Sequence, residues 1–376
     1  MVLPIEQERY RPGGERERAF PPSLALAGGW GYIGLKFLKA ALCNGVHVWV
    51  LDPGPVPDGV DLAQVELVND PQTFVELPAS LYHLALHPHH RMPLLQSLLS
   101  RSQRELGLTM LIEKPMVPWD RPSECDEVLQ AIKASRAIAL YDFLELFDPM
   151  TQLILNHWKR FKDIRITEVT LARSKDREDP AIERNYKPMQ PIQYQESCHC
   201  LAFLLFLLGH AGGGLTSPLS LPVSVRAKSL PYNSPCPELF PVPVDGRCEA
   251  EIRIGETDVH LLTNFKRGAP WQKRKTMRGV ADGQPFMIEA DYLEGAKWLR
   301  IDGVDQGCDP HGNSCENVLA ELWRLVNAGE AKSLPSGIYP DAAFSRYIYI
   351  LSSLLHQSCA SHETVETAAL SAHQIS

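Results

Sequence analysis

The chain has 376 residues, of which 44% are hydrophobic and 22% are charged, and its formal net charge is −8. This length predicts two domains, and the composition is typical of a globular protein. The negative charge argues against a nucleic-acid partner, because such proteins carry a basic face. No apolar run reaches the about 20 residues needed to cross a bilayer, so we expect no membrane contact either.

The first 20 residues carry charges of both signs and lack the apolar region of a signal peptide. We expect residues 1–20 to be a mobile arm and the protein to be cytoplasmic. Nine cysteines lie at scattered positions without a CxxC pair. Such a set predicts reduced, mostly buried thiols and no disulfide framework.

Residues 21–148 alternate between apolar runs and helical patterns. An apolar run begins at 23, a glycine cluster and a helical pattern follow, and a buried strand is expected at 46–52. Further strands are expected at 81–88, 108–115 and 137–147, with helices at 91–106 and 122–136. This alternation is typical of a doubly wound parallel sheet, and it predicts an N-terminal Rossmann domain for binding a dinucleotide.

Residues 149–358 are expected to form a second α/β domain with a large, mostly antiparallel open sheet. After a helix at 149–161 the apolar residues alternate with period two, as in half-exposed antiparallel strands. The basic segment 271–279 is interpreted as a strand edge with solvated lysines. Closing helices are predicted at 315–329 and 340–358, which could pack back on the first domain, and a polar, frayed tail at 359–376. The strands are predicted at 163–173, 222–230, 248–255, 258–265, 286–293 and 296–303.

A glycine motif, GWGYIG, stands between the first apolar run and the first helix. Its glycines, Gly29, Gly31 and Gly34, have G-x-G-x-x-G spacing. In a dinucleotide site the first permits a tight turn, the second lets the backbone approach a pyrophosphate, and the third allows close packing of helix on sheet. The exposed N–H groups at the helix start would hold the phosphate charge. We also expect cofactor contacts from the residues between the glycines, Trp30, Tyr32 and Ile33.

Asp52 ends the second strand, 23 residues after Gly29. A carboxylate at about this distance binds the adenosine ribose in dinucleotide sites. No arginine follows it to receive a 2′-phosphate, so the sequence favours NAD over NADP. The alternative is a structural turn followed by a strand-terminal aspartate.

The tripeptide EKP, residues 113–115, stands at the carboxyl end of a predicted parallel strand, where open α/β sheets bind their ligands. Lys114 could there form a hydrogen bond to a reacting hydroxyl or carbonyl oxygen. An exposed lysine at a strand end is by itself more often solvated than catalytic.

Together, GWGYIG, EKP, a histidine-bearing helix near residue 199 and the closing segment ENVLAELWRLVNAGE resemble the Gfo/Idh/MocA oxidoreductases. The resemblance spans about residues 23–357, and EKP is its most specific element. It implies a Rossmann domain followed by an α/β domain whose open sheet serves substrate contact and assembly into a homodimer or homotetramer. It also implies hydride transfer to or from sugars, inositols and similar polyols.

The resemblance assigns roles to individual residues. Lys114 falls on the family's catalytic lysine, and His199 on the histidine of its D-x-G-x-H motif. Glu113 and Pro115 complete the turn that shapes the nicotinamide pocket. The family's cofactor-binding positions are occupied by Gly29, Gly31, Gly34 and Asp52.

The sequence departs from the family's motifs at three positions. Gln195 and Ser197 replace the motif's aspartate and glycine, and Met92 replaces a histidine in a segment where Pro88 is retained. Gln195 cannot take a proton or stabilise an imidazolium by charge. Glu196, one residue on, is about 100° further around a helix and is therefore an uncertain substitute.

Pro88 and His89 are expected near the nicotinamide ribose. With His87 and His90, His89 is predicted to lie in a loop after the third strand, either beside that ribose or in solvent.

The segment CHC, residues 198–200, allows rival interpretations. A metal site would need about four convergent ligands, whereas Cys198 and Cys200 point to different helix faces, so we expect no metal. A cysteine nucleophile would need an activated thiolate beside a base, and adjacent helical residues diverge. His199 could also be a purely structural histidine at the start of a buried helix.

The leading prediction is an NAD(H)-dependent dehydrogenase or reductase acting on a sugar-like polyol, with Lys114 and His199 exchanging the hydroxyl proton. Possible substrate contacts are Arg184 and Tyr186, in the charged segment 173–187. One alternative is a redox-neutral enzyme that oxidises its sugar transiently, such as an epimerase, lyase or glycosidase. Another is a non-catalytic nucleotide-binding scaffold or sensor.

Overall fold

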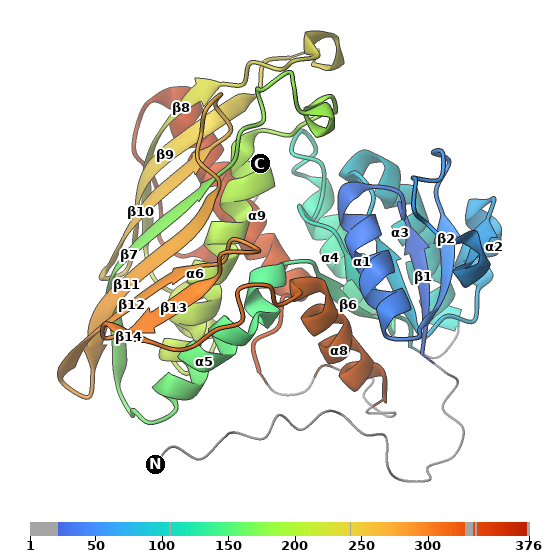
Figure 1. Ribbon diagram of the computed structural model, residues 1–376. Coiled ribbons are helices and arrows are strands. Elements are labelled where there is room, and N and C mark those ends of the chain that lie inside the picture. Colours follow the sequence, from blue (N-terminus) through green and yellow to red (C-terminus); the bar gives the residue numbers. More distant parts are fainter. Residues whose placement is uncertain (1–21, 105–106, 241, 328–333, 335–336, 374–376) are drawn as a thin grey trace.

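A six-stranded parallel sheet forms the centre of the N-terminal domain, with strand order β3-β2-β1-β4-β5-β6 (Figure 1). The computed structural model describes residues 22–104, 107–240, 242–327, 334 and 337–373; the expected arm at 1–20 lies outside them. The strand order reverses between β1 and β4, and ligands of such sheets bind beyond the carboxyl ends of the strands at this point. The strands are β1 Ser23–Ala27, β2 His47–Leu51, β3 Val65–Val68, β4 Leu81–Leu84, β5 Thr109–Ile112 and β6 Ile138–Tyr141.

Helices cover both faces of this sheet, which is why all five residues of β1 are buried. Leu24 and Leu26 pack in one cluster with residues of α1 (Tyr32–Cys43) and α8 (Ser314–Asn327). Ala25 and Ala27 belong to the opposite cluster, with residues of α3 (Pro88–Arg104) and α4 (Glu124–Ala134). The closing helix α8 therefore completes the N-terminal domain, although it comes from the far end of the chain.

Two elements of this domain were not predicted. The strand β3 has the sequence VELV, in which only Val68 is buried, and so it lacks a clear apolar signal. The helix α2 (Pro71–Glu76) has six residues and begins at Asp70, whose side chain accepts a hydrogen bond from the N–H of Thr73. The strand expected at 137–147 is shorter than predicted, because a 3₁₀ turn follows at Leu144–Phe147.

The C-terminal domain contains a nine-stranded sheet with the order β14-β13-β12-β11-β7-β10-β9-β8-β15. Its neighbouring strands are antiparallel except for β7 and β10, so the expected mostly antiparallel sheet is confirmed. The helix α5 (Pro149–Trp158) leads into it. The strands are β7 Ile164–Ser174, β8 Val223–Pro231, β9 Asp245–Ile254, β10 Thr257–Asn264, β11 Gln272–Ala281, β12 Gln284–Asp291, β13 Trp298–Ile301, β14 Val304–Asp305 and β15 Val365–Thr367.

The basic segment 271–279 is a strand, as predicted, but the expected edge position and solvated lysines were wrong. It forms β11, which lies between β7 and β12 and is not an edge strand. Lys275 is buried, pairs with the carboxylate of Glu145, and has its ammonium nitrogen 4.2 Å from the centroid of the Tyr292 ring. The alternating charges that suggested solvent exposure include a lysine that is neutralised inside the domain.

Two helices cover the inner face of the nine-stranded sheet, α6 (Cys198–Ala211) and α9 (Ala342–Ser361) (Figure 1). The helix α6 is apolar almost all round, as a helix packed on several sides must be. Its residues share one core cluster with those of α9 and of the sheet. Two short helical segments also precede and follow α6, the π-helix Gln193–Ser197 and α7 (Thr216–Leu219).

The prediction of a frayed tail was also wrong. The helix α9 continues to Ser361, and residues 365–367 form β15, which pairs with β8 at the edge of the sheet. Leu370 is fully buried. Strand pairing and the burial of Leu370 therefore hold this segment in place, although it is rich in alanine and polar residues.

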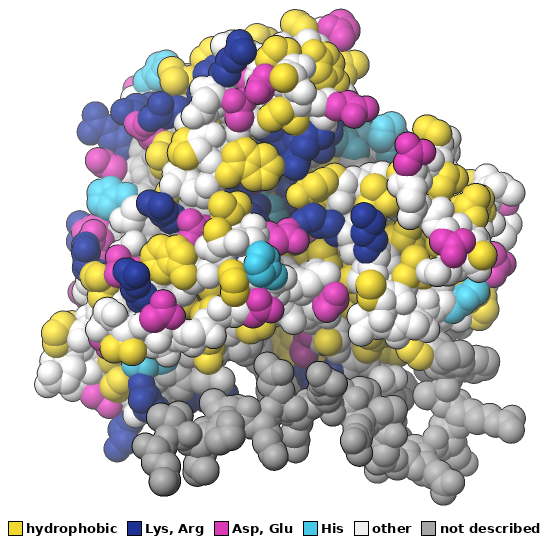
Figure 2. All heavy atoms as spheres, viewed as in Figure 1, with side chains coloured by type: hydrophobic (Ala, Val, Ile, Leu, Met, Phe, Trp, Pro, Cys, Tyr) yellow, Lys and Arg dark blue, Asp and Glu magenta, His cyan; other side chains and the backbone are white. Residues whose placement is uncertain are grey.

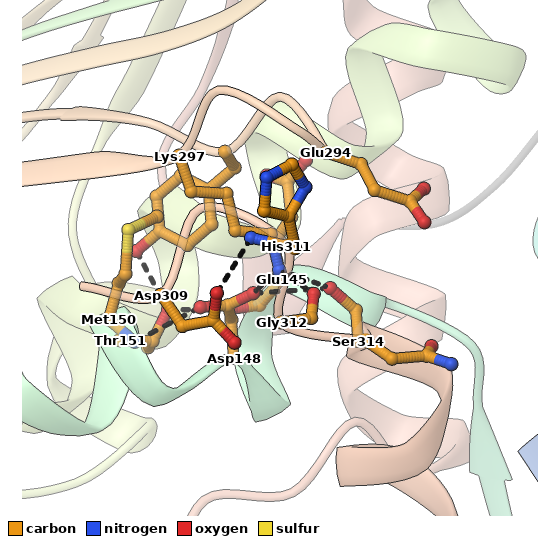
Figure 3. Close-up of polar contacts among 12 residues, drawn as sticks. Glu145, Asp148, Met150, Thr151, Glu294, Lys297, Asp309, His311, Gly312 and Ser314 are labelled. Atoms are coloured by element: carbon orange, nitrogen blue, oxygen red, sulfur yellow. Dashed lines mark hydrogen bonds and ion pairs between the residues drawn. The ribbon is translucent and has the colours of Figure 1, made fainter.

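A buried ion pair joins the two domains. The Lys297 ammonium donates to the Asp148 carboxylate at 2.7 Å and to the carbonyl of Gly312 at 2.6 Å. The Ser314 hydroxyl, in the first turn of α8, donates to the same carboxylate at 3.1 Å. Figure 3 shows Lys297 reaching from the loop before β13 to Asp148, with Ser314 beside it. Since both charges are 2% exposed, this pair fixes the start of α8 against the second domain.

All nine cysteines are free, as predicted, and seven of them are buried. None of the helices in the described ranges is long and apolar enough to cross a membrane.

Candidate functional site

A cavity of about 300 Å³ lies between the two domains, at the carboxyl ends of β5 and β6. The first domain contributes the start of α1 and the turns after these strands. The second contributes the end of β7, the segment after it, the start of α6 and the start of β11. Lys114, His199, Gln195, Glu196 and Arg184 all line this cavity, so the structure brings together residues that are far apart in the sequence.

The glycine loop adjoins the cavity, which Tyr32 and Ile33 line, and its backbone is suited to a dinucleotide. A Cβ atom on Gly34 would stand 2.1 Å from the carbonyl oxygen of Gly28, and one on Gly29 would stand 2.5 Å from Val50. Gly28 has a φ of 81°, which favours glycine. A side chain is thus excluded at Gly28, Gly29 and Gly34 by contacts within the domain, and a phosphate group can approach the backbone there.

Asp52 lies directly against this loop. Its carboxylate accepts hydrogen bonds from the N–H of Trp30 at 2.9 Å and from the N–H of Gly54 at 2.8 Å. Each carboxylate oxygen has a second lone pair, so Asp52 can also accept from a ribose hydroxyl. Its charge opposes a 2′-phosphate at the same place.

Lys114 and His199 reach the cavity from opposite domains. The ammonium of Lys114 donates to the backbone carbonyl of Gln195 at 2.9 Å. The ring of His199, on the first turn of α6, lies edge-on to Phe143 with 6.1 Å between centroids. Burial and the neighbouring Arg173 and Lys114 cations hold the pKa of His199 well below its usual range. His199 is therefore held in its neutral form, in which a ring nitrogen can accept a hydrogen bond from a hydroxyl group.

Gln195 contacts Lys114 through its backbone carbonyl, and its side chain forms hydrogen bonds elsewhere. Its side-chain oxygen accepts from the N–H of Gln190 at 2.9 Å, and its side-chain nitrogen lies 3.4 Å from the sulfur of Met189. The amide is thus used to hold the preceding loop, whereas its carbonyl orients Lys114. Gln195, which stands where the resembling family has an aspartate, therefore contacts Lys114 through its backbone only.

Glu196, the possible substitute for that aspartate, is engaged mainly with two other cations. It is 3% exposed, and it pairs with Arg173 and with Lys175. Although burial opposes its charge, these two cations hold the pKa of Glu196 well below its usual range. Arg173 also pairs with Glu145, and so links Glu196 to the buried Lys275. Glu196 is consequently held as a carboxylate within a chain of ion pairs.

A buried cluster of titratable groups lies beneath Lys114. The ligand atoms of His83, Glu113 and Asp142 all lie within 4.8 Å of one another. Both ring nitrogens of His83 and one oxygen of each carboxyl have no hydrogen-bond partner among the described residues. Within these residues it is the group whose spacing could hold a metal ion. No motif in the sequence indicates this cluster, because its members come from three different strand ends.

Replacing Asp142 by asparagine is expected to stabilise the protein at high pH. Burial and the adjacent Glu113 carboxyl raise the pKa of Asp142 well above its usual range. The unfolded chain therefore releases this proton at lower pH than the folded chain, which costs stability as pH rises above about 4. We expect Asp142→Asn to add about 1–3 kcal/mol to the free energy of unfolding at pH 8, and less at pH 4.

Urea denaturation at both pH values measures this effect, with the exposed Asp58→Asn as the matched control. A loss of stability in Asp142→Asn at pH 8 would contradict the prediction, and would show that the cluster needs the carboxylate as an anion, as a metal site does.

Eight predicted residues lie outside the cavity lining, namely Gly29, Trp30, Gly31, Gly34, Asp52, Pro88, His89 and Tyr186. Tyr186 is 49% exposed, and its hydroxyl donates to the carbonyl of Pro180 at 3.2 Å. Pro88 and His89 begin α3, so His89 and His90 stand in a helical turn and not in the expected loop. His89 stacks on His87 and approaches Asp120 at 3.5 Å. Their contacts with a cofactor remain predictions.

Sequence reasoning missed a residue that supports the EKP turn. Arg91, in the first turns of α3, is fully buried and donates to the carbonyls of Glu113 and Pro115, and to that of Met116 at 3.3 Å. It therefore fixes the backbone on both sides of Lys114. A basic residue within an apolar helical pattern was the available signal.

Comparison with known proteins shows the fold. No protein-family model and no curated protein matches the chain. Among solved structures, a myo-inositol dehydrogenase from Corynebacterium glutamicum is 14% identical with a TM-score of 0.68, covering 92% of this chain and 99% of its own. Levoglucosan dehydrogenase in complex with NADH and levoglucosan is 13% identical with a TM-score of 0.67 and the same coverages.

A super-repressor mutant of Gal80p from Saccharomyces cerevisiae is also similar. It is 11% identical with a TM-score of 0.65, and the alignment covers 94% of this chain and 100% of that one. The two-domain fold expected from the resemblance to Gfo/Idh/MocA oxidoreductases is thus confirmed over most of the chain.

Proposed function

We propose that this protein, which has the fold of inositol and levoglucosan dehydrogenases, is an NAD(H)-dependent oxidoreductase acting on a sugar, an inositol or a similar polyol. The observation that carries the proposal is the meeting of Lys114 and His199 in one cavity beside the glycine loop. Solved structures with this fold include dehydrogenases, one of which is in complex with NADH and levoglucosan. The carboxylate of Asp52 supports a preference for NAD over NADP.

The chain's own groups would handle the proton of the reacting hydroxyl. Bound NAD supplies the hydride acceptor. Neutral His199 accepts the hydroxyl proton, and the Lys114 ammonium donates a hydrogen bond to the oxygen as its negative charge develops. The carbonyl of Gln195 holds Lys114 in place, because the two atoms are already 2.9 Å apart. Assembly into a homodimer or homotetramer through the open face of the nine-stranded sheet is part of the same proposal.

Titration with NADH and NADPH, followed by fluorescence, tests cofactor binding. We expect NADH to bind at least about tenfold more tightly, because Asp52 repels a 2′-phosphate. Turnover is tested by nicotinamide absorbance with a panel of polyols and sugars. Failure to bind either nucleotide would refute the proposal.

A non-catalytic nucleotide-binding sensor is the second candidate. It is favoured by Gln195, whose side chain gives His199 no carboxylate partner. Binding of NADH without turnover of any polyol would support it. A redox-neutral enzyme would instead convert its sugar with no net change in nicotinamide absorbance.

A further inference from the structure

The cavity is strongly basic, although the whole chain has a net charge of −8. Figure 2 shows Lys and Arg side chains in the hollow between the two domains. Four acidic residues also line the cavity, Glu113, Asp142, Glu196 and Glu294. The basic residues that line it are Lys36, Lys114, Arg173, Lys175, Arg177, Arg184, Lys187 and Lys273.

Ion pairs neutralise only part of this charge. Lys36 pairs with Glu294, and Arg173 and Lys175 share Glu196. The remaining cations have no carboxylate at ion-pair distance among the described residues. These are Lys114, Arg177, Arg184, Lys187 and Lys273.

Three of the unpaired cations come from one segment, which follows β7. Arg177 is 3% exposed, its Nε has no hydrogen-bond partner among the described residues, and its NH1 lies 3.5 Å from the Asn185 side-chain oxygen. Arg184 places its guanidinium carbon 4.2 Å from the Tyr32 ring centroid and 5.3 Å from that of Trp271. Its Nε is likewise buried and unpartnered.

Lys187 is half-buried among these like charges. Burial, and then Arg177, Arg184 and Lys114, lower the pKa of Lys187 to about 8. Burial and Arg173 lower the pKa of Lys273 to about 8 as well. Buried cations that repel one another cost folding stability, and a bound anion would remove that cost.

We infer that the substrate carries an anionic group, a carboxylate or a phosphate, which Arg177 and Lys187 bind while its reacting carbon lies beside Lys114 and His199. The substrate class is then a sugar acid or a sugar phosphate. This inference rests on the proposed function for the reacting end, but the anion site itself is carried by the unpaired cations.

The pyrophosphate of the cofactor is the other possible source of negative charge. Arg184 stacks on Tyr32 at the start of α1 and so stands nearest the glycine loop. Arg177 and Lys187 line the same cavity as Lys114 and His199. Arg177 and Lys187 are therefore assigned to the substrate.

Calorimetry with matched pairs of sugars tests the inference: D-glucuronate against D-glucose, D-galacturonate against D-galactose, and D-glucose 6-phosphate against D-glucose. At least one anionic member should bind about tenfold or more tightly than its neutral partner. Arg177→Met and Lys187→Met should weaken that binding by about 10- to 100-fold. The exposed Lys133→Met is the matched control and should bind as the unmodified protein does.

Each variant is also titrated with NADH. Unchanged NADH affinity with weakened sugar binding supports the inference. Weakened NADH binding with unchanged sugar binding would assign the cations to the cofactor and overturn it, as would an absence of any preference for the anionic sugars. Lys187→Met should have an unchanged or higher melting temperature, because it removes a repelling charge.

The two proposals can fail separately. If anionic sugars bind selectively but NADH does not bind, the anion site stands and the oxidoreductase proposal falls. If NADH binds and a neutral polyol is oxidised with no preference for anions, the oxidoreductase proposal stands and the anion site falls.

Discussion

Replacing Lys114 by alanine is expected to lower kcat by about 10²- to 10⁴-fold, the usual effect of removing a general acid or base. The physical reason is that the developing alkoxide would lose its charged hydrogen-bond donor. NADH affinity should change by less than about tenfold, because in the proposed binding mode the glycine loop and Asp52 would contact the other half of the cofactor. Steady-state kinetics on the best substrate, together with NADH titration, measure both effects.

Lys114→Arg should not restore activity, since a guanidinium stays protonated and has a different shape. The exposed Lys133→Ala serves as the matched control. Full activity in Lys114→Ala would show that the lysine only lines the cavity, and NADH binding without turnover in every form would favour the sensor.

Replacing Arg91 by leucine is expected to destabilise the protein by about 3–5 kcal/mol, because a buried charged donor is removed from its acceptors. The carbonyls of Glu113, Pro115 and Met116 would be left without a donor. Since these residues flank Lys114, kcat should fall more than NADH affinity in any protein that still folds. Urea denaturation and kinetics below the melting temperature separate the two losses.

Arg91→Lys should be less harmful, because an ammonium can donate to one or two of these carbonyls but lacks the planar fork. Arg104→Leu, at an exposed position of the same helix, is the matched control. If Arg91→Leu keeps both its stability and its kcat, Arg91 does not position the EKP turn.

Much of the fold could be predicted from the sequence, because periodicity reflects local geometry. The strand–glycine–helix pattern at 23–45 and the period-two strands after 163 gave the two domains. The failures occurred where the apolar signal was weak or misleading. The strand β3 exposes most of its residues, and β11 carries Lys275, whose burial depends on a carboxylate 130 positions away in the chain.

The residues of the candidate site likewise fall into two groups, those that a sequence motif indicates and those that only the folded structure brings together. Gly34, Lys114 and His199 were found from motifs, since a turn, a strand end and a helix start each leave a local pattern. Arg91 and the cluster of His83, Glu113 and Asp142 were not, because each depends on contacts between separate strand ends. Gln195 could be named from the sequence, but the direction of its side chain could not.

The sequence by itself thus determined the two-domain fold, the glycine loop and several residues of the candidate site. Only the tertiary structure decided the charge state of the cavity. A row of basic residues in sequence shows neither which of them are paired nor how deeply they are buried. Glu196 is paired twice, whereas Arg177 and Lys187 have no carboxylate partner in the described chain. Because the energy of a buried charge depends on its nearest partners in space, that difference first becomes visible when the chain is folded.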